Sequence, residues 1–288
     1  MEKTIVRHFL YPALLSPPPS LSFSDQFAFR PAGSPAAAII TLLSLITNSL
    51  LTNPFVIVIS LDFSKAFDTV RHSTLLEKFA QLHIPDEVYN WLADYFRGHS
   101  HSTVYRDQTS TLKSINASII QGSGIGPTSY VVNAGDLGPL TTGNHLVKFA
   151  DDTYLIVPAS NIDSRSAEMN NIEAWAQKNN LALNRSKSKE TLFTDPRRKR
   201  QYISPLPLPG VVRETSVIIL GVTITDRLSA SDHIRGIISN SARTLYAMKV
   251  LRAHGMRDAA LQVVFRSVIV AKLLYASSAW CGFIKEAD

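Results

Sequence analysis

Runs of apolar residues along the chain predict alternating helices and strands. The run Phe55–Leu61 is continuous and rich in β-branched residues, which is typical of a central strand buried on both faces. Leu146–Ala150 and Thr153–Val157 are short apolar runs on either side of two aspartates, which predicts a hairpin. The helical period predicts helices over 35–51, over 72–97 with a break at Pro85, over 163–180, and from Ser231 onward.

Turn residues and weaker periodicities account for the rest of the chain. Residues 102–120 alternate enough to predict strands, and Val217–Thr225 is predicted as one strand. Glycines at 122, 124 and 126 with Pro127 mark a loop that leads into a helix. Residues 1–30 predict a short helix, a proline-rich turn and a loop, and 196–209 predict a loop. This mixture of helices and strands predicts an α+β fold.

Composition narrows the class of protein. With 288 residues the chain forms one large domain or two small ones. Hydrophobic residues make up 45% and charged residues 18%, which excludes a disordered polyampholyte. The single cysteine, Cys281, excludes a disulfide framework and a cysteine-rich zinc module. A net charge of +6 permits a polyanionic partner without requiring one.

A stretch without charge, Pro31–Leu61, is long enough to be considered as a membrane span. Several Ser, Thr and Asn residues interrupt it, and Pro54 separates a helix-like half from a strand-like half. No basic flank precedes Asp62, where the stretch ends. The first 15 residues make a poor signal peptide. We therefore expect a buried helix followed by a buried strand, with a membrane span as the alternative.

Three aspartates carry the candidate chemistry. Asp62 follows the buried strand directly, and Asp151 and Asp152 lie at the tip of the predicted hairpin. Carboxylates at the ends of core strands are costly to desolvate unless they bind something positive. If the two strands are neighbours, these hard oxygen ligands suit Mg²⁺, and two such ions can activate a hydroxyl and stabilise a leaving pyrophosphate. The alternative is that Asp62 caps a helix and the pair forms an ordinary turn.

Several sequence blocks, in this order along the chain, carry a resemblance to a known family. They are QFAFRPAGS (26–34), LDFSKAFD (61–68), QGSGIGP (121–127), FADD (149–152), LNRSKSK (183–189) and LGVTI (220–224). Together they resemble the reverse transcriptase of non-LTR, LINE-type retrotransposons, with the best fit to the CR1-, L2- and Jockey-like branches. Group II intron and retroviral polymerases share the palm, but FADD and the KSK block favour the LINE class.

The resemblance implies an α+β polymerase palm, an antiparallel sheet backed by helices, with partial fingers and a helical thumb. Its implied boundaries are fingers at 1–54, palm at 55–230 and a thumb-like region at 231–288. It implies an RNA-directed DNA polymerase that adds dNTPs to a primer 3′-OH with two Mg²⁺ ions. The implied partners are an RNA template and a DNA primer, without a membrane. The implied localisation is intracellular, nuclear and cytoplasmic, as a ribonucleoprotein.

The resemblance also assigns roles around the carboxylates. Asp62, Asp151 and Asp152 are the family's catalytic and metal-binding carboxylates by motif position. Phe63 offers its backbone carbonyl to a metal. Phe67 lies where the family places an aromatic ring under the incoming sugar, so that it rejects a ribose 2′-OH; the alternative is an ordinary core phenylalanine.

Five further residues receive implied roles outside the carboxylates. Gln121 and Gly122 resemble the loop that contacts the incoming nucleotide, where a glycine allows close backbone approach. Ile120 stands where the family has proline, and a P-loop is a weaker alternative because no GK[ST] ending follows. Arg30 resembles a fingers arginine that meets the triphosphate, or is a surface arginine. Lys187 or Lys189 protonates the leaving pyrophosphate, and the sequence does not distinguish the two.

The last implications concern the ends of the chain. Basic residues of the predicted thumb (Arg235, Arg243, Lys249 and Arg252) are candidate backbone contacts, and PRRKR (196–200) is a nuclear-localisation or nucleic-acid patch or a solvated loop. In the family the fingers begin upstream of Met1 and an endonuclease lies elsewhere, so the chain resembles a fragment of a larger reading frame. A catalytically inactive or domesticated nucleic-acid-binding remnant is the alternative function.

Overall fold

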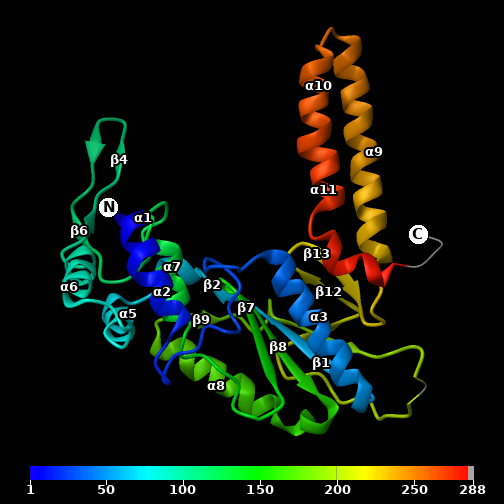
Figure 1. Ribbon diagram of the computed structural model, residues 1–288, viewed down its shortest axis with the longest axis horizontal. Coiled ribbons are helices and arrows are strands. Elements are labelled where there is room, and N and C mark those ends of the chain that lie inside the picture. The colour runs from blue at the N-terminus through cyan, green and yellow to red at the C-terminus, as the bar shows by residue number, and fades with distance from the viewer. Residues whose placement is uncertain (199, 285–288) are drawn as a thin grey trace.

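A five-stranded sheet forms the centre of the protein in this computed structural model, which describes residues 1–198 and 200–284 (Figure 1). Neighbouring strands pair antiparallel, except that β10 pairs with β11 in parallel. The predicted α+β class, an antiparallel sheet backed by helices, is confirmed. In spatial order the strands are β11 (Val212–Glu214), β10 (Lys189–Phe193), β1 (Val56–Leu61), β8 (Asp152–Pro158) and β7 (His145–Phe149).

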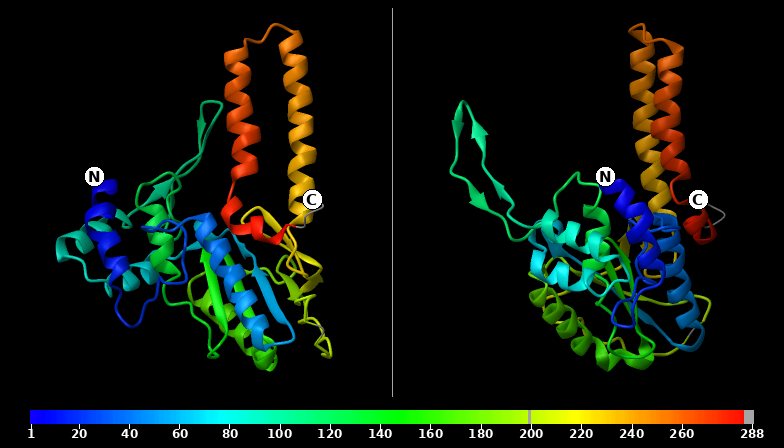
Figure 2. Two further views of the ribbon diagram at one scale, coloured as in Figure 1. Left: turned by 45° about the vertical axis from the view of Figure 1, so that its right-hand side comes forward. Right: turned by 60° about the vertical axis from the view of Figure 1, so that its left-hand side comes forward.

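The central strand β1 is buried on both faces, as its continuous apolar run predicts. Ile57 and Ile59 belong to one hydrophobic cluster, which includes residues of α8 (Arg165–Lys178). Val56 and Val58 belong to a second cluster, which includes residues of α3 (Pro35–Thr52). Successive side chains of a strand point to opposite faces, so the two helices cover opposite faces of the sheet (Figures 1 and 2). Each of these fully buried side chains contributes roughly 1.5–3 kcal/mol.

Helix α3 accounts for the charge-free stretch. Ser34 caps the N-terminus of this helix, because its Oγ accepts a hydrogen bond from Ala37 N at 3.1 Å. The helix ends before Asn53. Its inner face packs in the second cluster, which explains its apolar composition without a membrane. Among the described residues, two segments are long and apolar enough to cross a membrane, Pro35–Thr52 and Asp258–Phe283. Length and composition alone are weak evidence for a membrane span. That the chain has no membrane partner stays a prediction.

A group of short helices lies at one end of the sheet (Figure 1). A helix with a π-helical middle runs through α1 (Glu2–Ile5) and α2 (Tyr11–Leu15). The predicted helix 72–97 is divided at Pro85, as expected. The further members of this group are α4 (Ala66–Thr69), α5 (His72–Phe79), α6 (Asp86–Tyr95), α7 (Gly126–Asn133) and the small pair β2 (Phe63–Ser64) and β9 (Ala182–Leu183).

Residues 100–114 form a long two-stranded ribbon that projects from this end (Figures 1 and 2). Its strands are β3 (Ser100–His101) paired with β6 (Lys113–Ser114), and β4 (Val104–Tyr105) paired with β5 (Gln108–Thr109). Strands were predicted over 102–120, but their separation from the core is a new observation.

The predicted single strand Val217–Thr225 is wrong in one respect. It is a hairpin of β12 (Ser216–Ile219) and β13 (Val222–Thr225), because Leu220 and Gly221 both have positive φ, 47° and 87°. That backbone suits a two-residue turn of the type that joins antiparallel strands. An apolar leucine at the first turn position hid the turn in the sequence pattern.

Two long helical segments stand side by side and project away from the sheet (Figure 1). They are α9 (Ser231–Ala253) and the run α10 (Asp258–Val264) to α11 (Ala271–Leu274), followed by α12 (Ser277–Trp280). The helical character predicted from Ser231 onward is present. Leu261 is buried, whereas Leu245 and Leu274 are 48% and 64% exposed. The boundaries at 54 and 230 stay predictions.

Candidate active site

The sheet register brings the three aspartates to one edge. Leu61, the last residue of β1, pairs with Thr153 of β8. Continuing this register by one residue sets Asp62 opposite Asp152, which begins β8. Asp151 occupies the two-residue turn between β7 and β8. Residues 89 positions apart in the sequence therefore meet because their strands are hydrogen-bonded neighbours.

The carboxylates influence one another electrostatically. Burial raises the pKa of Asp151, and the charge of Asp62 adds to the rise. Burial also raises the pKa of Asp152, followed by the charges of Asp151 and Asp62. Like charges placed close together raise carboxyl pKa values in this way when no cation balances them. No ion pair between described residues neutralises any of them.

The donor set fits a hard divalent cation. Carboxylates held together without a basic partner gain most from a positive ion. In the described part of the chain, no group of three His, Cys, Asp or Glu side chains is already gathered at metal-binding spacing. Mg²⁺ usually takes only one or two carboxylates and completes its shell with waters and substrate phosphates. The arrangement is thus compatible with ions that arrive with a nucleotide.

Phe67 lies beside this edge of the sheet. Its ring stacks on the buried Tyr130, with 4.4 Å between centroids and 20° between planes. Burial raises the pKa of the Tyr130 phenol, and the charges of Asp151 and Asp152 raise it further. Tyr130 therefore connects the Phe67 ring to the carboxylates. Sequence reasoning missed Tyr130, although an aromatic residue in the helix after the glycine loop was a usable signal.

The first strand continues into residues that hold the neighbouring motif. Phe63 pairs with Leu183 in the small β2–β9 sheet, and its ring meets Trp175 edge-on at 5.9 Å. Asp62 O accepts a hydrogen bond from Asn184 N at 2.8 Å. The LNRSKSK block is thus fastened to the backbone of the first aspartate. That the Phe63 carbonyl binds a metal stays a prediction.

The two candidate lysines differ in their surroundings. Lys189 Nζ pairs with Glu214 Oε1 at 3.3 Å, and both side chains are about half exposed. Lys187 is exposed in the turn before β10. Among the residues that the structure describes, no hydrogen bond or ion pair holds its side chain. Of the two, only Lys187 keeps all its donors available.

The predicted nucleotide-binding residues have mixed surroundings. Gln121 Nε2 donates to Asp68 Oδ1 at 2.9 Å. Gly122 has φ +86° and open space where a side chain would lie, so its backbone is accessible. Arg30 Nη1 donates to the carbonyl oxygens of Phe23 and Gln26. These bonds tie the guanidinium to its own loop, and its contact with a triphosphate stays a prediction.

A buried lysine that sequence reasoning missed holds the aspartate hairpin. Lys148 of β7 is 1% exposed, and its Nζ pairs with Asp25 Oδ2 at 3.0 Å. The same Nζ donates to Ala134 O and Leu137 O, just past the end of α7. Burial lowers the pKa of Lys148, which Asp25 opposes. A lysine within the apolar run before FADD was the available signal.

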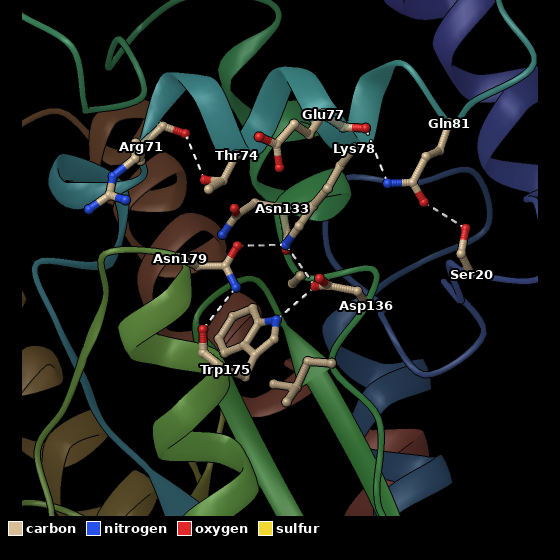
Figure 3. A network of polar contacts seen from close by, with 12 residues as sticks. Ser20, Arg71, Thr74, Glu77, Lys78, Gln81, Asn133, Asp136, Trp175 and Asn179 are labelled. Carbon is tan, nitrogen blue, oxygen red and sulfur yellow. Dashed lines mark hydrogen bonds and ion pairs between the residues drawn. The ribbon is translucent and has the colours of Figure 1, made fainter.

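A second buried lysine supports the same helix end (Figure 3). Lys78 Nζ donates to Asn133 O, to Asp136 Oδ1 at 2.7 Å and to Asn179 Oδ1 at 2.7 Å. Trp175 Nε1 donates to the same Asp136 oxygen. Cations near a helix C-terminus are favourable because of the helix dipole. Two buried lysines therefore fix α7, the helix that carries Tyr130.

The basic block PRRKR lies in a separate place. Arg197 and Arg198 line a hollow of about 490 Å³ together with Arg227, and Arg198 Nη1 donates to Leu51 O at 2.8 Å. Lys199 lies outside the described residues. A role of this block in nuclear localisation or nucleic-acid binding stays a prediction.

The amino-acid sequence is similar to known proteins over most of its length. Residues 9–224 match the family described as reverse transcriptase (RNA-dependent DNA polymerase). The chain is 26% identical over 238 residues to the probable RNA-directed DNA polymerase from transposon X-element of Drosophila melanogaster, covering 76% of this chain and 25% of that protein. It is 25% identical over 272 residues to the one from transposon BS of the same organism, covering 88% and 30%. The chain therefore spans less than a third of these relatives.

Solved structures show the same fold. Apo telomerase from Candida tropicalis aligns with a TM-score of 0.56 at 14% identity, over 79% of this chain and 40% of that chain. Telomerase from Candida albicans with a fragment of telomeric RNA aligns with a TM-score of 0.54 at 11% identity, over 76% and 36%. At such identities the likeness concerns the fold alone, which is the palm-type polymerase fold predicted from the sequence.

Proposed function

Because the chain belongs to the reverse transcriptase family, we propose that it forms the palm of an RNA-directed DNA polymerase that extends a DNA primer on an RNA template. The observation that carries the proposal is the pairing of β1 with β8, whose register, continued by one residue past Leu61 and Thr153, sets Asp62 opposite Asp152 and next to Asp151. The pKa values of Asp151 and Asp152, raised by burial and by neighbouring carboxylate charge, support a shared cation site. The relatives from the transposons X-element and BS, both named as probable RNA-directed DNA polymerases, support the same activity.

In this proposal the chain's own residues position and select the reactants. The three aspartates and the Phe63 carbonyl would hold two Mg²⁺ ions, which would supply Lewis-acid activation of the primer hydroxyl and charge neutralisation at the leaving pyrophosphate. The Phe67 ring, held by its stack on Tyr130, occupies the space that a ribose 2′-OH would need. The Gln121–Gly122 backbone lies against the incoming dNTP, with Arg30 near its phosphates.

Lys187 is proposed as the residue that protonates the pyrophosphate. Its side chain has no competing partner in the described structure, whereas Lys189 pairs with Glu214. Lys187→Ala is expected to slow single-turnover extension more than Lys189→Ala does. Equal slowing by both variants would remove the distinction, and slowing by Lys189→Ala alone would reverse it.

Primer extension tests the activity. The chain, and a version lengthened upstream, is given a primed RNA template, dNTPs and Mg²⁺, and labelled primer is followed. Asp163→Asn is the matched control, because Asp163 is an exposed aspartate outside the three. Extension that survives Asp163→Asn and is lost in Asp62→Asn supports the proposal. Extension by neither version, with RNA still bound, would favour the inactive remnant.

A further inference from the structure

The ribbon projects from the end of the sheet that carries the short helices, and its side chains contribute nothing to the buried core. All residues from Ser100 to Ser114 are exposed, and the turn at Arg106 and Asp107 lies at its tip. Figure 2 shows the ribbon extending well away from the rest of the molecule. We refer to residues 99–115 as the β-arm. A two-stranded hairpin without a core beneath it is marginally stable in water, so a bound partner would account for its presence.

The exposed side chains of the β-arm indicate the chemistry of that partner. Val104, Tyr105 and Leu112 are 69%, 67% and 69% exposed. The guanidinium of Arg106 lies over the Tyr105 ring, 5.2 Å from its centroid. A tyrosine with a neighbouring arginine suits a base that stacks and a phosphate beside it.

The charge of the β-arm is complementary to phosphate. Lys113 and Arg106 stand against one acid, Asp107. The remaining residues between them are mostly Ser and Thr, which donate hydrogen bonds. Its strands are only two residues long, so they offer little edge for a strand of another protein.

The base of the β-arm leads directly to the nucleotide loop. Ile115 N donates to His99 O at 2.7 Å, which closes the arm. Ile119 N then donates to Phe67 O at 2.8 Å, two residues before Gln121. The buried His72 lies at this connection, with its ring nitrogens 3.2 Å from Phe96 O and 2.7 Å from Ser118 O.

From this placement we propose that the β-arm binds the single-stranded RNA template before it reaches the active site. Tyr105 stacks on a base, and Arg106 and Lys113 contact phosphates. The inference deepens the proposed function, because it rests on an RNA template being the substrate. It assigns template binding to a segment that lies outside the motif blocks.

Equilibrium binding tests the β-arm separately from catalysis. Fluorescence anisotropy follows a labelled, unstructured RNA of roughly 20 nucleotides, longer than one binding footprint. No Mg²⁺ or dNTP is added, so an inactive chain still gives a result. Tyr105→Ala is expected to weaken binding about fivefold or more, and Tyr105→Phe to retain the parent affinity, because stacking needs the ring alone. Arg106→Glu weakens binding and lowers its salt dependence.

Two further variants complete the design. Residues 100–114 are replaced by Asn-Gly, which can join His99 to Ile115 because those ends are hydrogen-bonded. Lys178→Glu is the charge-matched control, since Lys178 is an exposed lysine at the end of α8. An unchanged RNA affinity in Tyr105→Ala and Arg106→Glu would overturn the proposal. A loss of affinity no larger than the loss in Lys178→Glu would overturn it too, as would a loss of affinity for duplex RNA alone. If the shortened chain does not fold, the point variants decide.

Discussion

Replacing Lys148 by methionine is expected to destabilise the protein strongly. Methionine keeps much of the length of the apolar stem but cannot donate hydrogen bonds. The change removes an ion pair to Asp25 at 3.0 Å and hydrogen bonds to Ala134 O at 2.9 Å and Leu137 O at 2.7 Å. It leaves Asp25 without its cation at a position where burial already raises the pKa of that carboxyl.

The size of the effect follows from burial. Removing one partner of a buried pair costs about 3–5 kcal/mol, because the other charge is left uncompensated. Total stability of a domain is about 5–15 kcal/mol, so the loss is a large fraction of it. Urea unfolding followed by tryptophan fluorescence measures the change. The Lys148→Met/Asp25→Asn double variant should recover part of the loss, since it removes the orphaned charge.

Two results would refute this reasoning. A loss below about 1 kcal/mol in Lys148→Met would mean that the pair contributes no more than an ordinary hydrogen bond. A double variant no more stable than Lys148→Met would mean that the cost is not the orphaned carboxylate. Phe9→Ala, at an exposed position of the first helical segment, is the control for the effect of a substitution that removes no buried ion pair.

Three further predictions concern the site and the sheet. Asp151→Asn should abolish extension without lowering the melting temperature much. Because the native pKa of Asp151 is raised, the stability of the parent protein falls as the pH rises from about 3.8 through the native pKa. The melting temperature of the variant should therefore fall less over that pH range than the melting temperature of the parent. A large destabilisation, with no stabilisation of the parent by Mg²⁺, would make Asp151 a structural turn residue. Phe67→Val, in an active form, should raise incorporation of rNTPs relative to dNTPs, and an unchanged ratio would reduce Phe67 to a packing residue. Ile59→Ala should cost about 2–5 kcal/mol in urea unfolding, because it opens a cavity in the central strand, and a loss below that range would mean the core closes around it.

Local pattern was sufficient to predict the sheet and its aspartates. The run Phe55–Leu61 has no polar residue before Ser60, so burial on both faces was its simplest explanation. The hairpin was visible because two apolar runs flank Asp151 and Asp152. Their meeting with Asp62 needed a long-range strand pairing, which the motif resemblance suggested and periodicity alone did not.

Other features could not be read from one sequence. The burial of Lys148 depends on its ion pair with Asp25, which is far away in the chain, as well as on carbonyl groups from just past the end of α7. The turn at Leu220 is hidden in the sequence because leucine is apolar, like the strand residues on either side of it. The position of Tyr130 against Phe67 depends on how α7 is seated, and that is decided by Lys78 and Lys148 from two other elements.

The central strand also determines how late in synthesis of the chain the sheet can be completed. Ile59 pairs on one side with Leu155 and on the other with Glu190. Until residue 190 has been synthesised, one edge of β1 lacks its partner, and synthesis at 5–20 residues per second takes on the order of ten seconds to add the intervening chain. During that interval the β10 edge of this continuous apolar strand is unpaired. Chaperone protection of the nascent chain is therefore expected to matter most between the emergence of β1 and that of β10.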